Sequence, residues 1–126
     1  MKSTVAIVDD DSGVRTALSS LLRALGCEVR TYAGAREFID AVPPLPDLLI
    51  SDIQMPGCDG EQLLAELRAR GRHLPTVFMT AFPNTARRQR LLAAGALACL
   101  DKPVEADTLA GFVAALVPRA ERLDPG

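Results

Sequence analysis

The sequence predicts an α/β domain in which a parallel sheet is covered by helices on both faces. Five short apolar runs alternate with stretches of helical periodicity, and the runs are apolar on both faces of the strands that they predict. This alternation is typical of successive βα units. The length of 126 residues suits one domain with one hydrophobic core. We expect the domain to occupy residues 1–118 and residues 119–126 to form a tail or the start of a linker.

Two βα units are predicted in the first third of the chain. Residues 5–8 form the first apolar run, and Asp11–Ser12 then offers an N-cap for a helix that Gly26 ends. Apolar residues with the i, i+3, i+4, i+7 spacing define this helix: Val14, Leu18, Leu21, Leu22 and Leu25. Residues 29–32 form the second run. The second helix has its apolar face at Ala35, Phe38, Ile39 and Val42.

Three further units follow a stiff, proline-rich connection that contains Pro43, Pro44 and Pro46. The apolar runs of these units are residues 48–50, 77–79 and 97–100. Gly71 and Gly95 stand just past the first two helices, and Asn84 can cap the second of them. The apolar positions that predict the three helices are, in order, Leu63, Leu64 and Leu67; Leu91 and Leu92; and Leu109, Phe112, Val113 and Leu116.

Composition excludes several classes of protein. The net charge of −2 argues against strong nucleic-acid binding by this domain. Three scattered cysteines and a single histidine do not make a structural zinc site, and free cysteines suit a reducing compartment. The sequence has no signal-peptide core and no apolar stretch of membrane-spanning length. We therefore expect a cytoplasmic domain.

Polar residues that carry chemistry stand where the predicted strands end. They are Asp9, Asp10, Asp52, Thr80 and Lys102. In parallel sheets of this kind the ligand site lies beyond the carboxyl ends of the strands, so we expect these five side chains to share one site. Carboxylates, a hydroxyl and an ammonium form the set of groups that phosphoryl transfer requires.

Each group has a distinct role in such chemistry. Asp9, Asp10 and Asp52 can bind Mg²⁺, which offsets the repulsion between a carboxylate and a phosphoryl group. Thr80 and Lys102 can hold the phosphoryl oxygens. Asp52 is the natural nucleophile, because its attack on phosphorus gives an acyl phosphate.

Four motifs resemble the signature of the response-regulator receiver domain of two-component systems. They are Val8-Asp9-Asp10, Asp52-x-x-Met55-Pro56-Gly57-x-x-Gly60, Thr80-Ala81 and Lys102-Pro103. The resemblance covers nearly the whole chain. It implies a flavodoxin-like (βα)5 three-layer sandwich with strand order 2-1-3-4-5. It also implies a phosphoprotein that takes a phosphoryl group onto Asp52 from a sensor histidine kinase or a phosphotransfer protein.

The resemblance further implies residue roles and partners. The backbone carbonyl of Gln54 would join Asp9, Asp10 and Asp52 in arranging Mg²⁺, and the bond before Pro103 would be cis. Phosphorylation adds about 1.5 to 2 negative charges and would reorder the fourth helix, fifth strand and fifth helix, here residues 84–117. That surface would meet an output domain, a partner or a second copy. Such a domain catalyses only its own phosphoryl transfer and hydrolysis, and binds neither membrane nor nucleic acid directly.

Two residues concern the readout of the switch. Three residues before the lysine, the family usually has Tyr or Phe, whose ring reports the movement of the threonine, whereas this chain has Cys99. Phe82, two residues after Thr80, is the nearest aromatic residue that could take that place. We hypothesise that it does.

Alternative interpretations remain at three points. The chain could be a receiver-like docking module that no longer switches, an interpretation that Cys99 favours. It could also be a haloacid-dehalogenase-type phosphohydrolase, but that class has a second Asp two residues after the nucleophile, where this chain has Gln54. Asp11 is expected to cap a helix rather than bind metal. Residues 67–100 lack acidic side chains and contain six arginines. These arginines form either a docking face for an acidic partner or two solvated helix surfaces. We favour the solvated surfaces.

Overall fold

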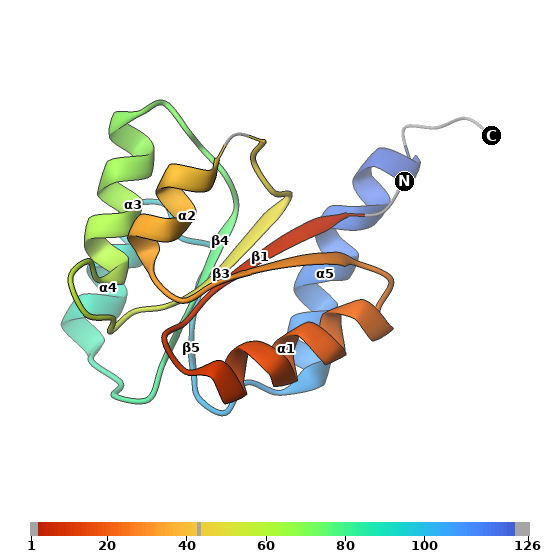
Figure 1. Cartoon of the computed structure of the whole chain (residues 1–126), viewed down its shortest axis with the longest axis horizontal. Helices are drawn as coiled ribbons and strands as arrows, with labels where there is room; N and C mark the ends of the chain where they lie inside the picture. The colour runs from red at the N-terminus through yellow and green to blue at the C-terminus, as the bar shows by residue number, and fades with distance from the viewer. Residues whose placement is uncertain (1–2, 43, 123–126) are drawn as a thin grey trace.

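Five parallel strands form one sheet at the centre of the computed structural model (Figure 1). The structure describes residues 3–42 and 44–122, with side chains up to residue 115. The expectations for Pro43, for the side chain of Leu116 and for the tail from residue 123 lie outside the described residues. The sheet order is β2-β1-β3-β4-β5, so the predicted flavodoxin-like topology is confirmed.

Strands and helices alternate strictly along the chain. The strands are β1 (Thr4–Val8), β2 (Glu28–Tyr32), β3 (Leu48–Asp52), β4 (Thr76–Thr80) and β5 (Ala98–Asp101). The helices are α1 (Ser12–Ala24), α2 (Ala35–Ala41), α3 (Gly60–Ala69), α4 (Thr85–Ala93) and α5 (Ala106–Arg122). Helix α5 thus continues past Pro118 into residues 119–122, where the sequence predicts a tail or the start of a linker. None of the helices in the described part of the chain is long and apolar enough to span a membrane.

Each strand differs slightly from the apolar run that predicted it. Strands β3 and β4 extend to Asp52 and Thr80, because backbone pairing with the neighbouring strand needs no apolar side chain. Strand β2 departs from the expectation of strands apolar on both faces. It is an edge strand that pairs only with β1 and exposes Glu28, Arg30 and Thr31. Exposed polar side chains at an edge are ordinary, since an edge strand has less surface to bury.

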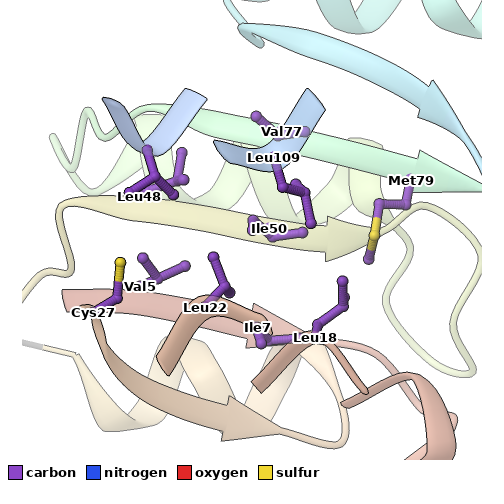
Figure 2. Packing of buried hydrophobic residues seen from close by; sticks show 11 residues of the cluster. Val5, Ile7, Leu18, Leu22, Cys27, Leu48, Ile50, Val77, Met79 and Leu109 are labelled. Atoms are coloured by element: carbon purple, nitrogen blue, oxygen red, sulfur yellow. The ribbon is translucent and has the colours of Figure 1, made fainter. Parts of the chain in front are cut away.

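The two faces of the sheet have separate cores. Helices α1 and α5 cover one face, where Leu18, Leu22, Leu109 and Val113 pack on β1, β3 and β4 (Figures 1 and 2). Helices α2, α3 and α4 cover the other face, and the fully buried Phe38 and Phe78 are the largest side chains there. The predicted three-layer arrangement is therefore confirmed.

Local signals placed the helix ends correctly. Asp11 caps α1 by accepting hydrogen bonds from the backbone N–H groups of Gly13 and Val14, at 2.8 and 3.3 Å. Asn84 caps α4 in the same way. Gly95 follows α4 with φ of 108°, a left-handed conformation that favours glycine. A capping box at the start of α3 was not predicted, although its pattern, Asp59 with Gln62 three residues on, can be read in the sequence.

The arginine-rich stretch is partly neutralised within the domain. The carboxylate of Glu61 on α3 lies 2.8 Å from Arg90 on α4. Glu66 pairs with Arg36 at 2.7 Å and with Arg70 at 2.9 Å. These pairs are partly solvent-exposed, so each contributes little to stability, but they leave less free positive charge for an acidic partner. They support the interpretation of solvated helix surfaces.

Gly60 is a position where the fold requires the absence of a side chain. A Cβ atom there would lie 2.8 Å from Cε1 of buried Phe78 and 3.1 Å from Cα of Ile53. We expect Gly60→Ala to lower the free energy of unfolding by about 1–3 kcal/mol, the usual range for overpacking. Denaturant unfolding followed by circular dichroism measures the change.

Gly111→Ala is the matched control for this substitution. Nothing lies within 4 Å of a Cβ at Gly111, in α5, so the same change should stabilise the protein by about 0.5–1 kcal/mol there. A Gly60→Ala variant as stable as the wild type would show that Phe78 yields to the added methyl group.

Candidate functional site

The backbone of the sheet fixes the site at its carboxyl edge. Asp52 is the last residue of β3, and Asp9 directly follows β1. The N–H of Asp9 donates to the carbonyl of Tyr32 on β2 at 3.1 Å, and the N–H of Lys102 donates to the carbonyl of Thr80 on β4 at 2.8 Å. The main chain of these residues is therefore held by the strand ends, as expected for a parallel sheet.

Three carboxylates gather at this edge. Asp9, Asp10 and Asp52 each present an oxygen, and these oxygens lie within 4.8 Å of one another. Asp9 is fully buried, Asp52 is 7% exposed and Asp10 is exposed. Hard oxygen ligands with one side open to water are the environment that Mg²⁺ prefers, since this ion keeps several of its waters. The residues thus fit a divalent metal, as the sequence predicted.

Lys102 links two of these carboxylates. Its Nζ lies 2.9 Å from Oδ2 of Asp9 and 3.4 Å from Oδ2 of Asp52. Desolvation lowers the pKa of Lys102, but the hydrogen bond that its ammonium donates to Asp9 and the charge of Asp52 outweigh this effect, so that the net pKa is raised. The ammonium therefore stays charged at neutral pH. We call Asp9, Asp10, Asp52 and Lys102 the acidic site.

Opposing interactions act on the pKa of Asp52. Burial and the nearby charge of Asp9 raise its pKa, while Lys102 and the backbone N–H of Gln54 act in the opposite direction without cancelling the rise. Two anions held close together in a partly desolvated place repel each other, and this repulsion favours the proton or a cation. A divalent ion or a phosphoryl group with its metal would relieve it.

Sequence reasoning missed Arg15. Its Nη1 donates to the backbone carbonyl of Asp9 at 2.7 Å, from the first turn of α1. In addition, Oδ1 of Asp9 accepts from the N–H of Asp11 at 2.9 Å. These two bonds hold the loop that carries Asp9 and Asp10. Their only signal in the sequence is that Arg15 stands one helical turn after Asp11, which is too common a spacing to single it out.

The remaining predicted residues lie beside the acidic site rather than in it. Thr80 is buried at the end of β4, and its Oγ1 accepts a hydrogen bond from the N–H of Phe82 at 2.9 Å. Cys99 is buried within β5, where it is paired in register with Phe78, whereas Phe82 is 66% exposed. The peptide bond between Lys102 and Pro103 is cis.

Fold and site together define a class of domain. It is a doubly wound α/β domain whose carboxyl edge carries three carboxylates closed on one side by a lysine ammonium, with a threonine hydroxyl on the adjacent strand. The chain belongs to the family of response regulator receiver domains, whose family model matches residues 5–114.

Known proteins agree with this assignment. The transcriptional regulatory protein FixJ of Bradyrhizobium diazoefficiens is 32% identical over 121 residues, which are 95% of this chain and 59% of FixJ. The DNA-binding transcriptional regulator NtrC of Klebsiella pneumoniae is 38% identical over 85% of this chain and 23% of NtrC. The solved structure of the Vibrio cholerae chemotaxis protein CheY4 matches with a TM-score of 0.83 at 28% identity, covering 92% of this chain and 99% of CheY4. The chain thus spans only part of the two regulators but the full length of CheY4.

Asp52→Asn is expected to stabilise the metal-free protein at neutral pH by roughly 0.5–2 kcal/mol, the usual gain from a single stabilising substitution. Because the pKa of Asp52 is raised in the native state, its ionised form destabilises that state at any pH above the raised pKa. Below the unfolded value of 3.8 the carboxyl is protonated in both states, and the gain should vanish. Denaturant unfolding at a series of pH values in chelator measures it; a gain independent of pH would contradict the explanation.

Mg²⁺ is expected to stabilise the wild type by about 2.7 kcal/mol at a hundred times its dissociation constant. Asp10→Asn should weaken Mg²⁺ binding at least roughly tenfold, since loss of an outer-shell partner alone has that effect. Asp11→Asn is the control: asparagine caps a helix as well as aspartate, and Asp11 points to the backbone of α1. Titration calorimetry compares the three proteins, and an equal loss in both variants would assign Asp11 to the metal.

Proposed function

We propose that this chain is a phosphorylation-activated receiver that accepts a phosphoryl group on Asp52. The observation that carries the proposal is the arrangement of Asp52 at the end of β3, with Asp9 and Asp10 beside it and the ammonium of Lys102 across Asp9 and Asp52. The family membership makes the domain a signalling domain. On this proposal it catalyses only its own phosphorylation and dephosphorylation.

In the transfer step, a carboxylate oxygen of Asp52 attacks the phosphorus of a phosphohistidine. The new O–P bond forms as the P–N bond breaks, and the imidazole leaves and takes up a proton. Asp9, Asp10, Asp52 and the carbonyl of Gln54 would hold Mg²⁺, which when bound supplies positive charge between the carboxylate and the phosphoryl oxygens. Arg15 keeps the loop of the metal ligands in place through the carbonyl of Asp9.

Lys102 and Thr80 respond to the new group. The ammonium already lies 3.4 Å from Oδ2 of Asp52, so a short rotation brings it to the phosphoryl oxygens that Asp52 acquires. The hydroxyl of Thr80 accepts a hydrogen bond from the N–H of Phe82 and has its own proton free to donate. Rotation of the Thr80 side chain toward the phosphoryl group would carry Oγ1 away from that N–H. Phosphorylation would thus change the connection between β4 and α4, which leads into the surface of α4, β5 and α5.

Partners follow from this mechanism and from the relatives. The donor would be a sensor histidine kinase or a phosphotransfer protein in the cytoplasm. FixJ is a transcriptional regulatory protein of which this chain covers 59%, which supports an output domain joined beyond α5, a helix that runs to Arg122. The alternative is an output through another protein or through self-association by the surface of α4, β5 and α5. A docking module that does not switch is disfavoured, since the acidic site has all its groups.

Incubation with Mg²⁺ and phosphoramidate, followed by intact-mass measurement, tests the proposal. The wild type is expected to gain the mass of one phosphoryl group, and Asp52→Asn to gain none. Asp59→Asn is the matched control, because Asp59 is a nearby aspartate that caps α3 and asparagine preserves the cap. It should be modified as readily as the wild type.

The other outcomes separate the alternatives. Absence of an adduct on the wild type would leave a docking module. Sustained release of phosphate from many phosphomonoesters, with no adduct specific to Asp52, would favour a phosphohydrolase.

A further inference from the structure

A pocket of about 250 Å³ lies between the β4–α4 connection and β5. Its lining includes Ile53, Thr80, Phe82, Arg88 and Cys99, and we call it the Cys99 pocket. Ile53 and Cys99 are the deepest of these residues, each 3% exposed, whereas Phe82 stands on the rim with 66% of its surface exposed. The pocket is therefore open to solvent at one end and reaches the buried core between α3, α4 and the sheet at the other.

The pocket exists because residue 99 is small. Cys99 belongs to the core cluster formed with Ile53, Leu64, Phe78, Leu91 and Ala96, and a larger side chain at the same place on β5 would extend into the space above it. The thiol itself is a poor reactive group, since burial raises its pKa more than the charge of Arg88 lowers it. Space is thus the property that Cys99 contributes.

Phe82 is the one aromatic residue in the lining of that pocket. Its ring is mostly in water, which is unfavourable for an apolar group of this size. A single hydrogen bond fixes its backbone to the site, from its N–H to Oγ1 of Thr80 at 2.9 Å. Phe82 and the pocket are therefore coupled to the hydroxyl that is expected to respond to phosphorylation.

We infer that the ring of Phe82 moves from solvent into the Cys99 pocket when Asp52 is phosphorylated. This inference rests on the proposed function. Rotation of the whole Thr80 side chain toward the phosphoryl group moves Oγ1 away from the N–H of Phe82 and breaks their hydrogen bond, and the released connection lets the ring turn inward. The ring then packs on Ile53 and Cys99, with the guanidinium of Arg88 at the pocket wall, a group that stacks well on aromatic faces.

Size supports this occupant. An apolar cavity of roughly 150 Å³ in another protein binds benzene, so a pocket of about 250 Å³ admits a phenyl ring. The ring comes from the rim of the pocket itself, so the change needs no movement of a whole element. The exposed surface of the β4–α4 connection would lose its one aromatic ring at the same time, and a partner could distinguish the two states by that loss.

Fluorine NMR of the chain labelled with 4-fluorophenylalanine tests the movement. The chain has four phenylalanines, and a Phe82→Leu variant assigns the resonance of Phe82 by its disappearance. Before phosphorylation this resonance should shift between H₂O and D₂O, as expected for an exposed ring. With Mg²⁺ and excess phosphoramidate the solvent shift should be lost. A fluorine–proton Overhauser contact from the Phe82 ring to the side chain of Ile53 should arise in the same sample.

Two variants at one position show whether the pocket is the destination. Cys99→Ala keeps the space, so the solvent shift should be lost on phosphorylation as in the parent. Cys99→Leu fills the space, so the ring should stay exposed although the adduct forms. The contact to Ile53 is measured on the parent chain and decides the matter even if Cys99→Leu does not fold.

The intact mass of each sample separates failure of this inference from failure of the proposed function. An adduct on Asp52 with an unchanged solvent shift overturns the movement of Phe82 and leaves the receiver function standing. Loss of the shift in both Cys99 variants, without a contact to Ile53, overturns the assignment to this pocket. Absence of any adduct on the parent overturns the function and this inference with it.

Discussion

The repulsion between Asp9 and Asp52 is the constraint to which the rest of the site responds. Both carboxylates are almost fully removed from water, and their oxygens lie within the range of a single metal ion. The ammonium of Lys102 compensates for this repulsion in part, at 2.9 Å from one and 3.4 Å from the other. Burial and the charge of Asp9 together raise the pKa of Asp52 more than Lys102 lowers it. The excess negative charge of such a site favours the binding of a divalent cation, and the bound cation in turn allows an anionic phosphoryl group to approach.

The packing of the domain holds this arrangement in place. Core clusters on both faces of the sheet fix the strands, and the strands bring residues from positions 9, 52 and 102 to one edge. Local contacts add to this packing. Arg15 donates to the backbone carbonyl of Asp9, and the N–H of Asp11 donates to its Oδ1. The absence of a side chain at Gly60 lets α3 approach Phe78 closely, behind the loop that follows Asp52. The cores on the two faces of the sheet thus provide stability, and the residues at its carboxyl edge form the site.

Much of this was predictable from the sequence, because apolar runs and turn residues act locally. The apolar runs place β3 and β4 to within two residues of their ends at Asp52 and Thr80, and the caps at Asp11 and Asn84 follow from residue type. Arg15 and the Cys99 pocket could not be predicted in that way. The contact of Arg15 depends on how α1 leaves the sheet, and a pocket depends on three segments that are distant in the sequence, around Ile53, Phe82 and Cys99. Strand β2 was only partly predicted, since an edge position is a property of the whole sheet.

The backbone hydrogen bonds at the carboxyl edge affect how fast the domain can respond to a new group on Asp52. The main chain of Lys102 is bonded to Thr80, that of Asp9 to Tyr32 and that of Ile53 to Met79. With the main chain held at these points, a response to a new group on Asp52 begins with side-chain rotation, which is faster than the motion of whole helices or domains. Any slower step in the response would then involve parts of the domain away from the carboxyl edge of the sheet. The duration of its signal would be set by how long the acyl phosphate on Asp52 survives hydrolysis, a chemical lifetime rather than a conformational one.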